Sequence, residues 1–310
     1  MKLIIDTDPG TDDAVAILVA LANFDNKEIV GITTVAGNVP VEVGTKNALR
    51  ILEFTGREGI PVYEGCSKPM VRELVTAEWV HGTDGLNNLD IPTTTLQKQE
   101  LSAVDFITKE LEESKEKITI GILGPMTNIG TVIKNNPALV EKIEKIVFMG
   151  GSALRGNTTP VAEFNTYVDP EAAKIVLNSG VEIYMLGLDV TNKSITTKSR
   201  KEKLIKINNK ASNAMLHLMT SLDDLPLVKE IYPDGTPVHD LLVSVFLVDP
   251  SIFSYKIVNV EVEVDSELTL GQTVVDSLGI SERKPNVNWV YNLDSDKVYN
   301  VLFDSANRLN

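Results

Sequence analysis

The chain opens with four closely spaced aspartates in the stretch Ile4-Ile5-Asp6-Thr7-Asp8-Pro9-Gly10-Thr11-Asp12-Asp13-Ala14. An apolar run precedes them and an almost wholly apolar run from 14 to 21 follows, which predicts a buried strand, a tight turn and a buried helix. Open α/β sheets bind their ligands where strands end and helices begin. Crowding like charges there costs free energy unless a cation or a polyhydroxyl ligand takes up the oxygens. The stretch therefore predicts a ligand site, with a metal as the favoured occupant.

Apolar, β-branched segments alternate with helical patterns over most of the chain. The predicted strands lie at 3–5, 29–35, 118–123, 143–149 and 181–188, and the predicted helices at 14–23, 41–55, 100–114, 126–134 and 170–178. This order predicts an α/β fold: an open, mostly parallel twisted sheet with a Rossmann-like core, flanked by helices. Alternation over 258–264 predicts a small antiparallel extension, followed by a terminal helix near 295–307. Because no linker composition appears, we expect one domain over 1–310.

Composition limits the classes of molecule that this chain is expected to bind and indicates its location. The 310 residues include 29 basic and 43 acidic ones, a formal charge of −14, so we expect no nucleic acid and no membrane partner. No run of about 18 apolar residues suggests a membrane span, and because the charged motif follows Met1-Lys2 almost directly we expect no signal peptide. The single cysteine, Cys66, favours a reducing, cytoplasmic location.

Several readings of the acid cluster are open. Its oxygen-only ligands favour Ca²⁺ or Mg²⁺. An EF-hand does not fit, because Thr11 stands where the turn glycine is needed and Ile17 where the bidentate glutamate is needed. A metal-dependent phosphohydrolase with Asp6 attacking and Asp8 as acid remains an alternative, although no phosphate cradle or lysine is evident.

Polar side chains also follow other predicted strands. Asn38, Asn157, Glu163 and Asn165 can pair with the vicinal hydroxyls of a sugar. A single asparagine commonly caps a turn, but several beside an acid cluster favour a sugar site.

The chain has three histidines. We expect His217, in an apolar helical stretch, to be structural. His239 precedes Asp240 and an apolar run, which fits a helix cap or a proton donor beside an oxygen ligand. Two long segments, 66–90 and 221–238, are predicted to be loops, either lids or plain surface excursions.

Taken together, these motifs resemble the calcium-dependent nucleoside hydrolases of the inosine-uridine-preferring type. The opening stretch matches that family's signature. Further matches follow in family order, through His81-Gly82-Thr83-Asp84-Gly85, Leu123-Gly124-Pro125-Met126-Thr127-Asn128 and His239-Asp240, and the whole set runs from residue 6 to 276.

The resemblance implies a role for each matching position. One Ca²⁺ per subunit would be held by Asp8, Asp13, Asp240 and the main-chain carbonyl of Leu123, and Asp8 would also take a proton from a calcium-bound water. The ribose would be bound by Asp12, Asn38, Asn157, Glu163 and Asn165, with Met149 beneath it. The leaving base would face His239 as the acid, with His81 and Phe164 on the base side.

The implied reaction is hydrolysis of the N-glycosidic bond of ribonucleosides of the uridine or inosine type, and the implied assembly is a homodimer or homotetramer. A non-catalytic, Ca²⁺-dependent nucleoside- or ribose-binding protein is a further alternative. The sequence departs from the family before His239, where Pro226 is expected to interrupt a helix and Tyr232 is the only aromatic residue. The preferred base therefore stays open.

Overall fold

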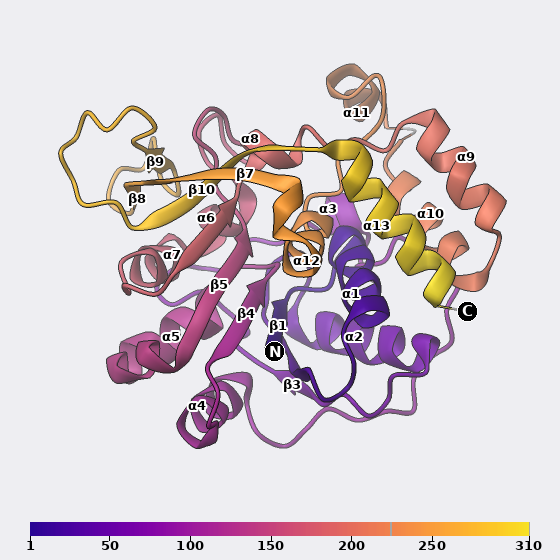
Figure 1. The fold of residues 1–310 in the computed structure, drawn as a ribbon, viewed down its shortest axis with the longest axis horizontal. Helices are drawn as coiled ribbons and strands as arrows, with labels where there is room; N and C mark the ends of the chain where they lie inside the picture. The colour runs from indigo at the N-terminus through magenta and orange to yellow at the C-terminus, as the bar shows by residue number, and fades with distance from the viewer. Residues whose placement is uncertain (224, 310) are drawn as a thin grey trace.

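The computed structural model describes residues 1–223 and 225–309. An open sheet of eight strands runs in the order β3-β2-β1-β4-β5-β6-β10-β7 (Figure 1). Its neighbouring strands are parallel except for the edge pair of β10 and β7, which is antiparallel. The predicted α/β fold with a mostly parallel sheet is confirmed.

The large sheet is made of strands β1 (Lys2–Thr7), β2 (Ile29–Thr34), β3 (Val62–Glu64), β4 (Ile118–Ile122), β5 (Ile143–Met149), β6 (Ile183–Leu186), β7 (Phe253–Val258) and β10 (Val287–Leu293). A separate antiparallel pair is made of β8 (Val260–Val262) and β9 (Thr273–Val275). This pair and the antiparallel β7 make up the predicted extension.

The helices are α1 (Thr11–Asn23), α2 (Val41–Thr55), α3 (Glu78–His81), α4 (Ala103–Glu113), α5 (Thr127–Asn135), α6 (Phe164–Val168), α7 (Pro170–Leu177), α8 (Leu188–Thr191), α9 (Lys198–Ile207), α10 (Lys210–Thr220), α11 (Pro226–Ile231), α12 (Leu241–Val248) and α13 (Ser295–Arg308). Among the described residues, no helix is both long and apolar enough to cross a bilayer.

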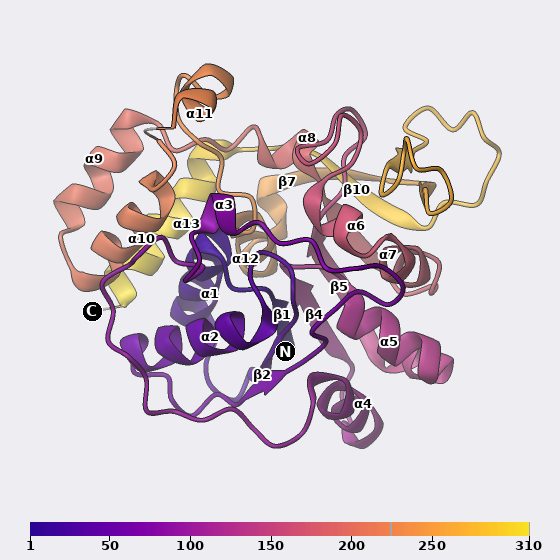
Figure 2. The same cartoon turned by 180° about the vertical axis from the view of Figure 1, so that it is seen from behind.

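Helices cover both faces of the sheet, as Figures 1 and 2 show from opposite sides. Helices α1, α2, α12 and α13 pack around one apolar cluster, and α4, α5 and α7 pack around a second. Successive residues of β1 alternate between them: Leu3 and Ile5 belong to the first cluster and Ile4 to the second. Because the sheet is buried on both faces, its central strands are apolar almost throughout.

Some elements were not predicted, and one prediction is wrong. Strand β3 has only three residues, and helix α9 buries only Leu204, so neither carries a clear periodic signal. The prediction that Pro226 interrupts a helix is wrong, because Pro226 is the first residue of α11. A proline is tolerated there, since the N–H it lacks has no partner within the helix. The two segments predicted to be loops, 66–90 and 221–238, each contain a short helix, α3 and α11 respectively.

Replacing Ile120 of the central strand β4 by alanine should lower the free energy of unfolding by about 2–5 kcal/mol, because it leaves a cavity in a fully buried site. Urea denaturation followed by circular dichroism measures this. The matched control is Ile205→Ala on α9, where the side chain is 55% exposed and the change should stay within about 0.5 kcal/mol. Equal losses in the two variants would contradict the assignment of the core.

Candidate active site

A cavity of about 410 Å³ opens where the parallel strands end and the helices begin. Of the predicted site residues, those that line it are Asp12, Asn38, His81, Leu123, Met149, Asn157, Glu163, Phe164, Asn165, His239 and Asp240. Asp8 and Asp13 are fully buried next to it. The fold therefore brings together positions from 8 to 240 at one edge of the sheet.

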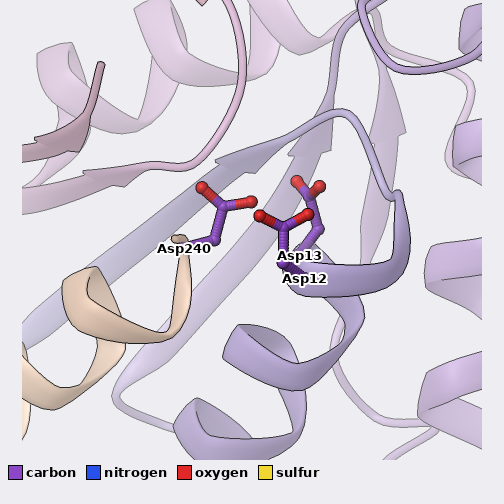
Figure 3. A group of neighbouring side chains, drawn as sticks. All are labelled: Asp12, Asp13 and Asp240. Carbon is purple, nitrogen blue, oxygen red and sulfur yellow. The ribbon is translucent and has the colours of Figure 1, made fainter. Parts of the chain in front are cut away.

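Three carboxylates converge at this cavity: Asp12 and Asp240 line it, and Asp13 is buried beside them. Asp12 and Asp13 lie in the first turn of α1, and Asp240 directly precedes α12 (Figure 3). One oxygen atom of each lies within 4.8 Å of the others. Oxygen atoms at this spacing can coordinate one hard cation. The resemblance implied Asp8 for this set, whereas the structure groups Asp12 with Asp13 and Asp240.

Asp8 lies beside this group. Its Oδ2 accepts a hydrogen bond of 2.7 Å from the main-chain N–H of Asn38, and its main-chain N–H donates to Asp13 Oδ1 at 3.2 Å. Its Oδ1 has no hydrogen-bond partner among the described residues, although it is buried. A buried carboxylate oxygen without a donor is costly, and a cation or a water molecule would remove that cost.

The backbone is tightly fitted around Asp8. A Cβ atom added to Gly37 would come 2.1 Å from Asp8 Oδ2, and one added to Gly124 would come 2.3 Å from Oδ1. Both positions therefore need glycine, and the two loops that follow β2 and β4 hold the Asp8 carboxylate between them.

Asp13 is held by four donors. They are the Thr7 hydroxyl at 2.6 Å, the Asn38 amide at 2.9 Å, and the main-chain N–H groups of Gly10 at 3.0 Å and Asp8 at 3.2 Å. These bonds tie the turn after β1 to the start of α1, where the helix dipole also favours negative charge.

Burial and the repulsion between neighbouring charges both affect the buried acids Asp8, Asp13 and Asp240. Burial raises the pKa of Asp8, Asp13 and Asp240 above the usual aspartate range. The neighbouring charges of Asp13 for Asp8, and of Asp12 for the other two, raise these pKa values further. A bound divalent cation would reverse this effect by favouring the ionised carboxylates. The donor set therefore fits a hard cation.

A second group of polar residues lies on the loop and short helix after β5. Glu163 is buried and accepts hydrogen bonds from the main-chain N–H groups of Asn165 at 2.9 Å and Gly151 at 2.9 Å. Burial raises the pKa of Glu163, and these bonds partly offset that rise. Asn165 Nδ2 donates to the carbonyl oxygens of Leu123 at 2.7 Å and Met149 at 3.2 Å. Asn165 thus links the ends of β4 and β5 beside the acids.

Two predicted histidines line the cavity. Thr191 Oγ1 lies 2.7 Å from His239 Nδ1, and burial lowers the pKa of His239. His81 closes the short helix α3, and its Nδ1 accepts a hydrogen bond of 3.1 Å from the main-chain N–H of Thr11. The third histidine, His217, bonds through Nε2 to the carbonyl of Asn87 at 2.9 Å and does not line the cavity, as expected of a structural residue.

Much of the remaining wall is apolar, and the sequence analysis missed it. It is built by α10, α11 and the residues around them: Leu218, Met219, Leu222, Leu225, Val228 and Ile231. Tyr232 joins this wall, and its hydroxyl donates to Asn192 Oδ1 at 3.0 Å. The apolar spacing within 215–222 was visible in the sequence, but it is equally typical of a helix that faces the core.

Asp6 lies outside the cavity. Its Oδ1 accepts hydrogen bonds from the Thr33 hydroxyl at 2.5 Å and from Asn128 Nδ2 at 2.8 Å. Its side chain is fully buried, and burial raises its pKa to about 7. A nucleophile must itself reach the substrate, and Asp6 does not line the cavity while its Oδ1 is taken up by Thr33 and Asn128, so the geometry does not support a phosphohydrolase that uses Asp6 as nucleophile.

Comparison with known proteins decides the reaction class. Residues 3–300 match the family model described as inosine-uridine preferring nucleoside hydrolase. The chain belongs to this family. It is therefore a nucleoside N-ribohydrolase that acts on a small nucleoside substrate.

Relatives align over nearly the whole chain. The uncharacterized protein C1683.06c of Schizosaccharomyces pombe is 40% identical, covering 100% of both proteins. Pyrimidine-specific ribonucleoside hydrolase RihA of Shewanella sp. is 38% identical, covering 98% of this chain and 95% of RihA. The solved structure of a purine-preferring ribonucleoside hydrolase from Gardnerella vaginalis superposes with a TM-score of 0.90 at 30% identity, covering 100% of this chain and 99% of that one.

In chelator-treated protein, the buried acids should make stability fall as the pH rises. Because the pKa of Asp240 is raised by folding, the folded state keeps a proton that the unfolded state releases above about pH 4. This contribution is present at low pH and is lost as the pH rises toward the folded pKa, by up to about 1.4 kcal/mol per pH unit. Urea unfolding of wild type and Asp240→Asn between pH 5 and 8 measures it. The variant should show the flatter slope; parallel slopes would contradict the assigned pKa shift.

Proposed function

We propose that this nucleoside hydrolase depends on calcium and cleaves the N-glycosidic bond of ribonucleosides to ribose and a free base. The observation that carries the proposal is a buried carboxylate group, including the unpartnered Asp8 Oδ1, under a cavity with one polar and one apolar side. Ribose hydroxyls suit the polar side, and a flat base suits the apolar side. Family membership supports the reaction class.

Calcium would be held by Asp8, Asp13, Asp240 and the carbonyl of Leu123. The raised pKa values of the three acids and the oxygen-only donor set support a hard cation. The Leu123 carbonyl accepts one hydrogen bond from Asn165, which leaves its second lone pair for a ligand. When bound, calcium would neutralise the buried acids and lower the pKa of the attacking water.

The sugar would lie over Met149, with its hydroxyls bound by Asp12, Asn38, Asn157, Glu163 and Asn165. The carboxylates of Asp12 and Glu163 would stabilise the positive charge that develops on the ribose in an oxocarbenium-like transition state. Main-chain donors hold the Glu163 carboxylate rigid, so this side chain needs little reorganisation when the transition state forms.

The proton transfers follow from this placement. Asp8 accepts a proton from water while the water oxygen bonds to C1′ of the ribose. The bond from C1′ to the base nitrogen breaks, its electron pair goes to the base, and His239 delivers a proton to that base. Attack is direct, without a covalent glycosyl-enzyme. His81 and Phe164 line the base side.

We further propose that pyrimidine ribonucleosides are the better substrates. The chain is 38% identical to the pyrimidine-specific RihA of Shewanella sp. and 30% identical to the purine-preferring hydrolase of Gardnerella vaginalis. Tyr232 offers one hydroxyl beside an otherwise apolar wall, which suits a small base with few polar edges.

We also propose that the protein forms a homodimer or homotetramer and acts in the cytoplasm. The exposed edge strand β7 carries Tyr255 and Ile257, which are 44% and 63% exposed, and such apolar edges commonly serve as contacts between subunits. The single cysteine suits a reducing compartment. Analytical ultracentrifugation measures the assembly.

Asp8→Asn should reduce base release from uridine by about 10²–10⁴-fold, because it removes the general base. Chromatography of free base from a panel of purine and pyrimidine nucleosides measures this, with and without a chelator. The matched control is Asp90→Asn, an exposed aspartate outside the cavity, which should act like wild type. Tight nucleoside binding without turnover by the wild type would instead identify a non-catalytic binding protein.

His239→Gln should lower kcat on uridine by about 10²–10⁴-fold, because the leaving base loses its proton donor. The loss on 4-nitrophenyl riboside should be much smaller, since nitrophenolate leaves without protonation. Steady-state kinetics on both substrates give the comparison. Equal losses on the two would mean that His239 does not act on the leaving group.

A further inference from the structure

His81 is fixed in the cavity wall by the first residue of α1. The main-chain N–H of Thr11 donates to His81 Nδ1 at 3.1 Å, and Thr11 Oγ1 lies 2.9 Å from the same nitrogen. The first N–H groups of a helix have no partner within it, so this donor is free to bind the ring. Gly10 lets the imidazole approach, because a Cβ there would come 2.7 Å from Nδ1.

This contact decides where the imidazole carries its proton. A main-chain N–H can only donate, so His81 Nδ1 must accept. If Nδ1 carried a proton, its N–H group and the N–H group of Thr11 would point at each other. The ring proton therefore lies on Nε2. No partner for Nε2 is found in the part of the chain that the structure describes, and His81 lines the cavity, which leaves the Nε2–H group for a ligand.

His239 is held in a different way. Its Nδ1 lies 2.7 Å from a hydroxyl, that of Thr191, which can either donate or accept. His239 can therefore carry a proton on either nitrogen or on both, as proton transfer requires. The two histidines on the base side are not equivalent, because only one of them faces an obligatory donor.

We propose that the main-chain N–H of Thr11 locks His81 as a fixed hydrogen-bond donor that recognises an acceptor atom of the nucleobase, and that His81 does not transfer a proton. The inference rests on the proposed function. The matching ligand class is a base with a lone pair next to its glycosidic nitrogen: the 2-carbonyl oxygen of a pyrimidine or N3 of a purine. His81 is then a specificity-determining residue, and Thr11 is its positioning residue.

Glutamine separates the two possible roles of His81, because its amide can donate a hydrogen bond from near the Nε2 position but cannot transfer a proton. We compare His81→Gln and His81→Leu by the ratio of kcat/KM for uridine to that for 4-nitrophenyl riboside, whose ring offers no such acceptor. The ratio should fall by about 10–100-fold in His81→Leu and by less than tenfold in His81→Gln. The matched control is His217→Gln, whose side chain lies outside the cavity. Equal falls in the two His81 variants would overturn the proposal.

The tautomer itself can be measured on the free enzyme. Long-range ¹H–¹⁵N NMR of protein labelled in its three histidines gives three ring patterns, and the one missing in His81→Gln belongs to His81. We expect a protonated Nε2 and an unprotonated Nδ1 at neutral pH; a proton on Nδ1 would overturn the lock. This readout needs no turnover. If no nucleoside is hydrolysed, the proposed function fails, while the spectrum still decides the tautomer.

Discussion

Burying carboxylates at the junction of β1 and α1 costs free energy, and the structure of the site depends on how that cost is offset. Asp8 and Asp13 are both fully buried, and they share their surroundings with Asp240. Their charges are tolerated because main-chain and side-chain donors converge on them from the strand ends, with Asn38 bonding to both. Glycine at 37 and 124 is required so that backbone can come this close. The loops after β2 and β4 are thus shaped by Asp8, which directly follows β1.

The polar and apolar sides of the cavity come from different layers of the fold. The strand ends and the loop after β5 supply the acids and amides, whereas α10 and α11 supply the aliphatic wall. The proposed function therefore assigns chemistry at the sugar and choice of the base to separate structural elements. This separation agrees with relatives that share the fold and differ in their named preference, one pyrimidine-specific and one purine-preferring.

The sequence predicted most of the buried frame, because parallel strands that are covered on both faces are apolar throughout. Short or polar elements carried no such signal: β3 has three residues, and α9 buries a single leucine. The acids and asparagines were visible as motifs at strand ends. Their pairing was not, since bonds such as that between Thr11 and His81 join residues 70 positions apart. The apolar wall of the cavity was missed because an apolar helix face does not reveal whether it lines a core or a cavity.

The last helix of the chain packs directly on the first. Helix α13 covers α1, and Asn23 Nδ2 donates to Ser305 Oγ at 2.8 Å. Tyr299 of α13 is 1% exposed, so this helix is part of the core. Helix α1, which carries Asp12 and Asp13 in its first turn, thus keeps part of its apolar surface uncovered until residues 295–308 pack on it.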